Sequence, residues 1–373
     1  MQKFSIVSLL LITMLPYLSV AANGSPGQPS PKEPVKIGIA RLTHGHIHGF
    51  FSRFEGRSDL ELVGIHEPDT ALARRIAKRY DLDSTLFYTD LHRMIEEENP
   101  AGIAIFSNTF EHKSLVETIA SAGVDIMLEK PLAVSMEHAR AMQKAVRENN
   151  VHLIVNYETS WYASNRFIHQ QVVAQNKIGN IRKMVVRSGH RGPKEIGVTD
   201  PFLSWLTDPK LNGGGALTDF GCYGANLMTW LMGNQRPITV TALTQQLKDD
   251  PVYAKVDDEA TIILEYPHAQ GIIQASWNWP YSRKDMEVYG TNGMMLAPDH
   301  NSVEFRYDGQ QRIAKEVSVQ SDRFDHYLSY FSAILRDRVE PKGLSSLENN
   351  MIVTEILDAA RKSARTGKSV SLE

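Results

Sequence analysis

The 373-residue sequence predicts an α/β protein in two parts: an amino-terminal domain built on a parallel sheet, and a carboxy-terminal α+β domain with a large, mostly antiparallel open sheet. Two patterns support this prediction. Up to about Asn156, short apolar runs alternate with helical spacing, which is typical of βαβ units. Beyond Asn156, apolar and polar residues alternate at period two, which is typical of antiparallel strands with one solvated face. At roughly 150 residues per domain, the length also suits two domains.

The first sheet is expected to be parallel, since each short apolar run is followed by a helical segment, a pattern that indicates βαβ units. Ligands of such a sheet bind at the carboxyl ends of its strands, where the loops gather. The expected strands are 35–40, 60–66, 102–106, 125–128 and 151–156, and the expected helices lie near His46 and at 70–80, 114–122 and 135–148.

The second half is expected to contain strands at 183–189, 260–266 and 272–279. Trp277 and Trp279 fall on the apolar face of the last one, so we expect them in the core or in an interface.

A final helix should begin at a capping box formed by Ser345 and Glu348 and end near Gly367. The predicted organisation is therefore a parallel-sheet domain in 35–155 and an α+β domain in 156–373.

The composition excludes several classes of protein. Forty basic and 43 acidic residues give a net charge of -3, so no positive field exists to hold a nucleic-acid backbone. The single cysteine, Cys222, excludes an internal disulfide framework and a cysteine-based zinc cluster. We expect Cys222 to be a small buried apolar residue and not a nucleophile.

The amino terminus has the pattern of a secretory signal peptide. Lys3 precedes an apolar run at 4–20, and small residues follow at 19–21. Residues 1–22 are therefore expected to be removed, and 23–34 to form a flexible leader. We expect a periplasmic or secreted protein that uses the general secretory route and has no membrane span after cleavage. An uncleaved membrane anchor is the alternative.

The loop after the first strand, RLTHGHIHG, would place a helix amino terminus against a phosphate. Glu67 ends the second strand, where a carboxylate can accept hydrogen bonds from an adenosine ribose. The GxGxxG pattern is absent, because Arg41, Thr43 and His46 stand where its glycines would be. Three histidines at a spacing of two also suggest a metal site. Since no carboxylate lies among them, we expect no metal and a loop that faces solvent or a phosphate.

Glu129-Lys130-Pro131 ends the fourth expected strand, so Lys130 should project from the ligand-binding edge of the sheet. Beside a cationic nicotinamide ring its pKa would be lowered, and it could exchange a proton with a substrate hydroxyl. An ordinary surface lysine is the alternative.

Gly213-Gly214-Gly215 would allow the backbone to approach a ligand closely. A helix should follow, with Asp219 and Tyr223 on one face because they are four residues apart. This carboxylate and phenol could bind vicinal hydroxyls and relay a proton. A glycine-rich loop with an ordinary helix cap is the alternative.

In this order, the motifs resemble the glucose–fructose oxidoreductase / inositol dehydrogenase / MocA (Gfo/Idh/MocA) family. The resemblance runs from Val35 to the end of the chain. The lysine and glycine motifs are fairly specific in combination, although neither is specific alone. Further matching segments are 108–112, 257–259, 290–293 and 363–368.

The resemblance implies a parallel sheet of the Rossmann type and an enzyme that moves a hydride between NAD(P) and a hydroxyl-bearing carbon of a sugar or cyclitol. Lys130 would be the catalytic lysine, Asp219 would orient the substrate, and Tyr223 would donate or accept the proton. Glu67 would favour NAD over NADP. A homodimer or homotetramer is expected through the open sheet. The implied cofactor-binding residues are Arg41, Thr43, His44, His46, Glu67, Asn108, His112, Glu129 and Lys130.

Other substrate contacts are expected only because of their positions after strands or beside glycines. In addition to Asp219 and Tyr223, they are Asn156, Tyr157, His190, Arg191 and Trp205.

We therefore expect an exported NAD(P)-dependent oxidoreductase that acts on a sugar, polyol or glycoside. One alternative is redox-neutral cleavage of a glycosidic bond by tightly held NAD. A second is a non-catalytic saccharide-binding relative.

Overall fold

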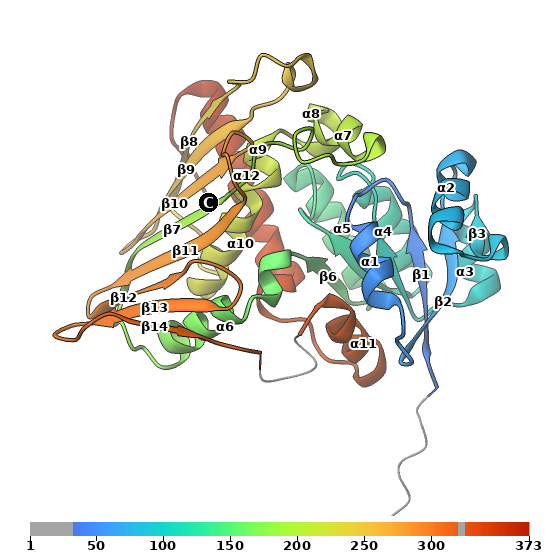
Figure 1. The fold of residues 1–373 in the computed structure, drawn as a ribbon, viewed down its shortest axis with the longest axis horizontal. Helices are drawn as coiled ribbons and strands as arrows, with labels where there is room; N and C mark the ends of the chain where they lie inside the picture. The colour runs from blue at the N-terminus through green and yellow to red at the C-terminus, as the bar shows by residue number, and fades with distance from the viewer. Residues whose placement is uncertain (1–32, 320–324, 373) are drawn as a thin grey trace, which may run out of the picture. The chain divides into compact units, whose positions relative to one another are not determined.

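A parallel sheet and a mostly antiparallel sheet organise the computed structural model, which describes residues 33–319 and 325–372 (Figure 1). The predicted signal peptide and nearly all of the predicted leader lie outside the described residues. The described residues from Pro34 onward belong to one compact unit. Among the described residues, no helix has both the length and the apolar character needed to cross a membrane.

The first sheet has six strands, all parallel, in the order β3-β2-β1-β4-β5-β6. Every residue of β4, β5 and β6 is buried, as expected for a parallel sheet covered on both faces. The strand order reverses between β1 and β4, which is where such sheets form a ligand crevice. The strands are β1 (Val35–Ala40), β2 (Leu60–His66), β3 (Phe87–Tyr88), β4 (Gly102–Ile105), β5 (Asp125–Glu129) and β6 (Leu153–Asn156).

Helices connect these strands, and side-chain caps begin several of them: Asp69, Asp90 and Ser135 each accept a hydrogen bond from the first turn that follows. The sequence pattern missed β3 and α3. The strand has two residues, and α3 buries a single apolar turn before an acidic run. The helices are α1 (Ile47–Phe54), α2 (Thr70–Tyr80), α3 (Leu91–Glu98), α4 (His112–Ser121) and α5 (Met136–Glu148).

The second sheet has nine strands in the order β14-β13-β12-β11-β7-β10-β9-β8-β15, and only the β7–β10 pair is parallel. This arrangement confirms the predicted fold class. Helices α10 and α12 cover one face of the sheet (Figure 1). Its strands are β7 (Ile181–Gly189), β8 (Thr239–Gln245), β9 (Glu259–Glu265), β10 (Gln270–Ser276), β11 (Arg283–Gly290), β12 (Gly293–Ala297), β13 (Ser302–Tyr307), β14 (Ile313–Glu316) and β15 (Val370–Ser371).

Helix α12 links the two sheets, because it contacts β8 of the second sheet and β6 of the first. The Asp358 carboxylate on α12 also accepts a hydrogen bond of 2.6 Å from the Met136 amide at the start of α5. The remaining helices are α6 (Ala163–His169), α7 (Asp200–Leu206), α8 (Pro209–Asn212), α9 (Ala216–Asp219), α10 (Gly221–Leu231), α11 (Tyr327–Asp337) and α12 (Leu347–Thr366). Short 3₁₀ turns lie at Ser84–Leu86, Glu158–Trp161, Pro251–Tyr253 and Gly343–Ser345, and a π turn lies at Gln170–Ala174.

The predicted capping box of the last helix is wrong by one residue. Ser346, not Ser345, is the cap of α12, and its hydroxyl accepts from the Asn349 amide at 3.3 Å. Ser345 belongs to the preceding 3₁₀ turn instead. The predicted end at Gly367 is confirmed, since Gly367 adopts the left-handed conformation with φ 66°.

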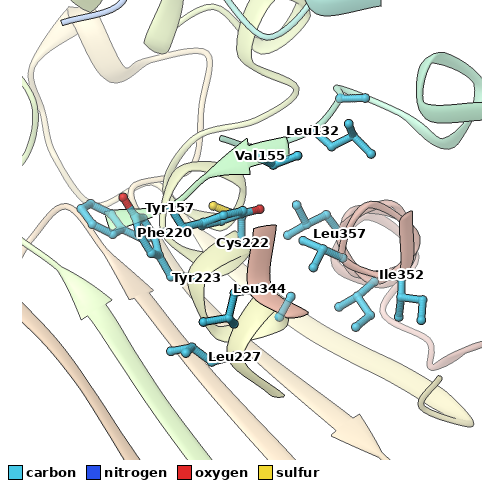
Figure 2. Packing of buried hydrophobic residues seen from close by; sticks show 14 of the residues in the cluster. Leu132, Val155, Tyr157, Phe220, Cys222, Tyr223, Leu227, Leu344, Ile352 and Leu357 are labelled. Atoms are coloured by element: carbon cyan, nitrogen blue, oxygen red, sulfur yellow. The ribbon is translucent and has the colours of Figure 1, made fainter. Parts of the chain in front are cut away.

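The core continues from the end of β6 to the start of α10 and on to α12. Figure 2 shows Tyr157, Cys222 and Tyr223 gathered there, with Leu132 and Leu357 of α12 both to their right. Cys222 is fully buried, and burial raises the pKa of its thiol to about 12. The expectation that this cysteine is a packed apolar residue is therefore confirmed.

Candidate active site

Lys130 and Asp219 form a buried ion pair at the carboxyl end of β5. The Lys130 ammonium lies 2.5 Å from Asp219 Oδ1, and each residue is 5 % exposed. The Trp277 indole donates to the other carboxylate oxygen, Oδ2, at 3.0 Å. Three distant segments thus meet at one carboxylate, which has both oxygens occupied by donors.

The ion pair sets the resting protonation of Lys130. Burial alone would lower the pKa of Lys130, but the Asp219 carboxylate raises it above its ordinary value. Burial would likewise raise the pKa of Asp219, and Lys130 lowers it instead. The resting pair is therefore ammonium and carboxylate. The lowered pKa that the sequence analysis expected for Lys130 beside a cationic nicotinamide ring stays a prediction.

Tyr223 completes the cluster, although not as expected. Asp219 ends the short helix α9, and Tyr223 lies in the first turn of α10, so the two residues are on separate helices. The Lys130 and Lys284 ammonium groups lie 5.3 and 4.8 Å from the centre of the Tyr223 ring. Burial raises the pKa of the Tyr223 phenol well above its ordinary value, which leaves it a neutral hydrogen-bond donor.

Gly213, Gly214 and Gly215 allow the turn before α9 to pack closely against other parts of the chain. Gly213 and Gly214 have positive φ values of 83° and 151°, which favour glycine. A Cβ on Gly215 would lie 1.8 Å from the Asp257 carbonyl oxygen. The Asp257 carboxylate accepts from the Gly215 amide at 2.9 Å and from the Leu217 amide at 2.6 Å. The close approach is thus to Asp257, where the sequence analysis expected a ligand, and it positions the helix that carries Asp219.

Arg41 occupies the first glycine position of the loop after β1, and it adopts a glycine-like φ of 71°. Its guanidinium donates to Glu111 at 3.1 Å and to Glu67 at 3.3 Å. Glu67 also accepts from the amides of Leu42 and Asp69, both at 2.9 Å. Glu67 therefore lies beside the loop as predicted, but three protein donors already contact its carboxylate.

Helix α7 covers the middle of this loop. The Trp205 indole donates to the Thr43 carbonyl at 3.2 Å, and a Cβ on Gly45 would lie 2.7 Å from the Phe202 ring. His44 is 1 % exposed, and its Nδ1 accepts from the His46 amide at 3.1 Å. Among the described residues, His44 Nε2 and Thr43 Oγ1 are buried without a hydrogen-bond partner.

Glu129 links the loop to the sheet. Its carboxylate lies 2.9 Å from His46 Nδ1 and accepts from the Asn156 amide at 2.8 Å. Ligand atoms of His44, His46 and Glu129 lie within 4.8 Å of one another, a set that could hold a metal ion. The sequence analysis missed the carboxylate of this set because Glu129 comes from another strand. The expected absence of a metal stays a prediction.

Two further predicted cofactor residues support nearby turns. Asn108 Oδ1 accepts from the Glu111 amide at 3.0 Å, ahead of α4. His112 Nδ1 lies 3.1 Å from the Leu132 carbonyl, just beyond Lys130. Burial lowers the pKa of His112 to about 4.

Among the predicted substrate residues, His190 lies in the cavity beside Asp219. Its Nδ1 accepts from the Gly192 amide at 2.9 Å, and burial lowers the pKa of its ring. Tyr157 is fully buried behind Tyr223, with the ring centres 5.5 Å apart (Figure 2). Arg191 contributes its carbonyl to a hydrogen bond with Lys248 at 2.7 Å.

A cavity of about 440 Å³ opens onto the ion pair, a size suited to a small-molecule site. Both halves of the chain line it, and residues 193–206 cover it. The predicted site residues in its lining are His46, Lys130, His190, Asp219 and Tyr223. The lining does not include Arg41, Thr43, His44, Glu67, Asn108, His112, Glu129, Asn156, Tyr157, Arg191 or Trp205.

Trp277 and Lys284 are among the residues of the site that sequence reasoning missed. Trp277 was assigned to the core or an interface, and it is fully buried, but its indole also holds Asp219. Its place on the apolar face of a strand gave no sign of this contact. Lys284 lines the cavity from β11, and no motif marks it in the sequence.

Comparisons with known proteins agree with this architecture. Residues 36–157 match an oxidoreductase family with an NAD-binding Rossmann fold, GFO/IDH/MocA, and residues 169–296 match the GFO/IDH/MocA C-terminal domain.

Characterised relatives match over most of the chain. Trans-1,2-dihydrobenzene-1,2-diol dehydrogenase of Sus scrofa is 23% identical over 320 residues, covering 82% of this chain and 89% of the relative. D-glucoside 3-dehydrogenase of Escherichia coli (strain K12) is 23% identical over 361 residues, covering 92% of this chain and 98% of the relative.

Solved structures share the fold. Aldose-aldose oxidoreductase from Caulobacter crescentus, complexed with glycerol, has a TM-score of 0.78 at 21% identity, covering 91% of this chain and all of that one. GenD2 from gentamicin A biosynthesis, in complex with NAD, has a TM-score of 0.74 at 20% identity, covering 94% of this chain and 99% of that one.

Proposed function

The chain belongs to the GFO/IDH/MocA oxidoreductase family, and from this premise we propose an exported NAD(P)-dependent oxidoreductase that acts on a hydroxyl-bearing carbon of a sugar, polyol or glycoside. The observation that carries the proposal is the buried Lys130–Asp219 pair beside the neutral phenol of Tyr223, at the carboxyl edge of the parallel sheet. These groups can hold a hydroxyl or carbonyl oxygen and move a proton at that oxygen.

Lys130, Asp219 and Tyr223 have different roles at the reacting carbon. In the reduction direction, the Lys130 ammonium donates a proton to the carbonyl oxygen while Asp219 holds the ammonium in place. In the oxidation direction, Lys130 must first lose one proton to water, and the neutral amine then accepts the proton of the substrate hydroxyl. Tyr223 donates a hydrogen bond to the same oxygen. A bound nicotinamide supplies or accepts the hydride, and its positive charge in the oxidised form favours neutral lysine.

The residues around the first loop fit a dinucleotide. The strand order reverses between β1 and β4, where sheets of this kind bind their ligands, and two buried polar atoms in the loop after β1, His44 Nε2 and Thr43 Oγ1, have no partner among the described residues. Glu67 and Arg41 would face the adenosine ribose, and His46 with Glu129 would lie toward the nicotinamide end. We propose NAD because a 2′-phosphate would meet the Glu67 carboxylate, although Arg41 offsets part of that repulsion.

The substrate class follows from the relatives and the site together. Both named dehydrogenase relatives act, by their names, on a diol or a glucoside. A carboxylate and a phenol within one cavity can contact neighbouring hydroxyls of such a compound. The intact ion pair favours a catalyst over a saccharide-binding protein without activity.

The test is incubation of the purified protein with NAD and, separately, with NADP, against D-glucose, myo-inositol, methyl glucosides and disaccharides. Reduced nucleotide and an equal amount of keto-sugar are expected. Free sugar released from a glycoside without net reduced nucleotide would replace this proposal with redox-neutral cleavage. Absence of both products, together with sugar binding by calorimetry, would identify a binding protein.

A further inference from the structure

A second cavity, of about 610 Å³, adjoins the catalytic one. Its walls come from residues 158–162, 281–287 and 296–300, which surround the first part of β11. Lys284 lines both cavities, so the two share a wall. We call the second cavity the outer groove.

The shared wall is made of polar side chains. The Lys284 ammonium lies 4.8 Å from the centre of the Tyr223 ring and forms an ion pair with Glu158. The Tyr162 hydroxyl donates to the same carboxylate at 2.6 Å. The side chain of Glu158 is 51% exposed, so the pair can rearrange at little cost. A ligand can therefore extend from Tyr223 into the outer groove along the Lys284 side chain.

The outer groove has the chemistry of a sugar site. Tyr281 is 62% exposed at its rim, and an aromatic face of this kind can pack against the apolar face of a pyranose. Tyr162 packs edge-on against His300 with the ring centres 6.0 Å apart. The Arg283 guanidinium donates to the Asp285 carboxylate, so the first supplies charged donors and the second supplies acceptors for hydroxyls.

We propose that the outer groove binds the second sugar ring of a glycoside whose first ring reacts beside Lys130. This inference rests on the proposed function and narrows its substrate class to disaccharides and related glycosides. The catalytic cavity must hold the reacting ring and the nicotinamide end in about 440 Å³, so a glycosidic substituent has to leave it. Lys284 lines both cavities, and the outer groove is the larger of the two.

The test compares kcat/KM for cellobiose, maltose and trehalose with kcat/KM for D-glucose. At least one disaccharide is expected to exceed glucose. Tyr281→Ala should lower the ratio of kcat/KM for that disaccharide to kcat/KM for glucose by about tenfold, mainly through a higher KM for the disaccharide. Ser282→Trp, which places a bulky ring in the groove at an exposed position, should lower the ratio further. Ile313→Ala is the control, since Ile313 is an exposed residue of β14 outside the groove.

Two outcomes would overturn the groove proposal. One is equal use of glucose and all three disaccharides. The other is a ratio that neither groove variant changes. If no sugar is oxidised, the proposed function fails instead, and calorimetry with the same four sugars still tests the groove. Tighter disaccharide binding that is weakened by Tyr281→Ala would support it, and equal affinity for glucose and disaccharide would refute it.

Discussion

At the scale of single residues, Lys130 controls proton transfer at the reacting oxygen. We expect Lys130→Met to lower kcat by roughly 10²–10⁴-fold, the usual contribution of a general acid or base. NAD affinity should change by less than about threefold, because Lys130 serves the reacting centre and the dinucleotide has other contacts. The measurements are steady-state kinetics and NAD titration by calorimetry.

This variant leaves the Asp219 carboxylate buried without its cation, which destabilises proteins by about 3–5 kcal/mol. Circular dichroism must therefore show that the variant is folded. Lys144→Met is the control, because Lys144 is an exposed lysine on α5. Full turnover in folded Lys130→Met would remove the assigned role.

A change at Glu67 tests the preference for NAD over NADP, because the Glu67 carboxylate lies beside the first loop and forms an ion pair with Arg41. Glu67→Gln should lower the preference for NAD over NADP by about tenfold, the size expected for a hydrogen bond to a charged group. Loss of the carboxylate also frees Arg41 to face a 2′-phosphate. Dissociation constants for both nucleotides provide the measurement. An unchanged ratio would mean that Glu67 does not face the ribose.

His112 links stability to pH. Burial depresses its pKa from 6.5 to about 4 in the folded chain, so the unfolded chain binds a proton first as pH falls. The contribution of neutral His112 to the free energy of unfolding is complete above pH 6.5, and it is lost as pH falls toward 4. At pH 5 the loss is about 2 kcal/mol.

The variant His112→Asn keeps a donor near the Leu132 carbonyl and has no titrating ring. Its free energy of unfolding in urea should therefore fall less between pH 7 and pH 5 than that of the parent. His92→Asn, at an exposed position of α3, is the control. Equal pH dependence in the parent and His112→Asn would contradict a depressed His112 pKa.

At the scale of elements, the glycine turn before α9 fixes the position of Asp219. In Gly215→Ala, the new methyl group would overlap the Asp257 carbonyl at 1.8 Å, so the turn must move. We expect a loss of several kcal/mol of stability, as for other overpacked sites, and a displaced Asp219 with lower kcat. Thermal unfolding and kinetics measure both effects.

Gly49→Ala is the control, because its Cβ would meet only the mobile end of Arg53 at 3.3 Å. In a helix this change should be neutral or stabilising by about 0.5–1 kcal/mol. If Gly215→Ala behaved like Gly49→Ala, the turn would not be the constraint that holds Asp219.

The elements also show what the sequence pattern can predict. The bounds of β1, β2 and α2 agree with the prediction, because their apolar spacing is set by burial against one sheet. The role of the glycine turn before α9 could not be predicted, since this turn packs against Asp257, which is far along the chain. The indole of Trp277 reaches Asp219 for the same reason: only the folded second sheet brings them together.

At the scale of the whole molecule, the candidate site exists only when both sheets are in place. Lys130 follows the parallel sheet, Lys284 belongs to the second sheet, and the helices carrying Asp219 and Tyr223 lie between them. The core is shared in the same way, so the two halves should unfold together. A ligand bound in the cavity contacts both halves and should stabilise the entire fold.

Dinucleotide binding should therefore raise the unfolding temperature of the whole chain in one transition. At a concentration 100 times Kd, a ligand that binds only the folded state contributes about 2.7 kcal/mol. Differential scanning calorimetry with NAD and with NADP measures the shift. Mass spectrometry of small molecules released on denaturation first establishes whether the purified protein already carries a nucleotide. A shift confined to the parallel-sheet half would mean that the cofactor does not join the two sheets. No shift with either nucleotide, in a protein that releases none, would contradict a dinucleotide site and leave the Lys130–Asp219 pair without a hydride partner.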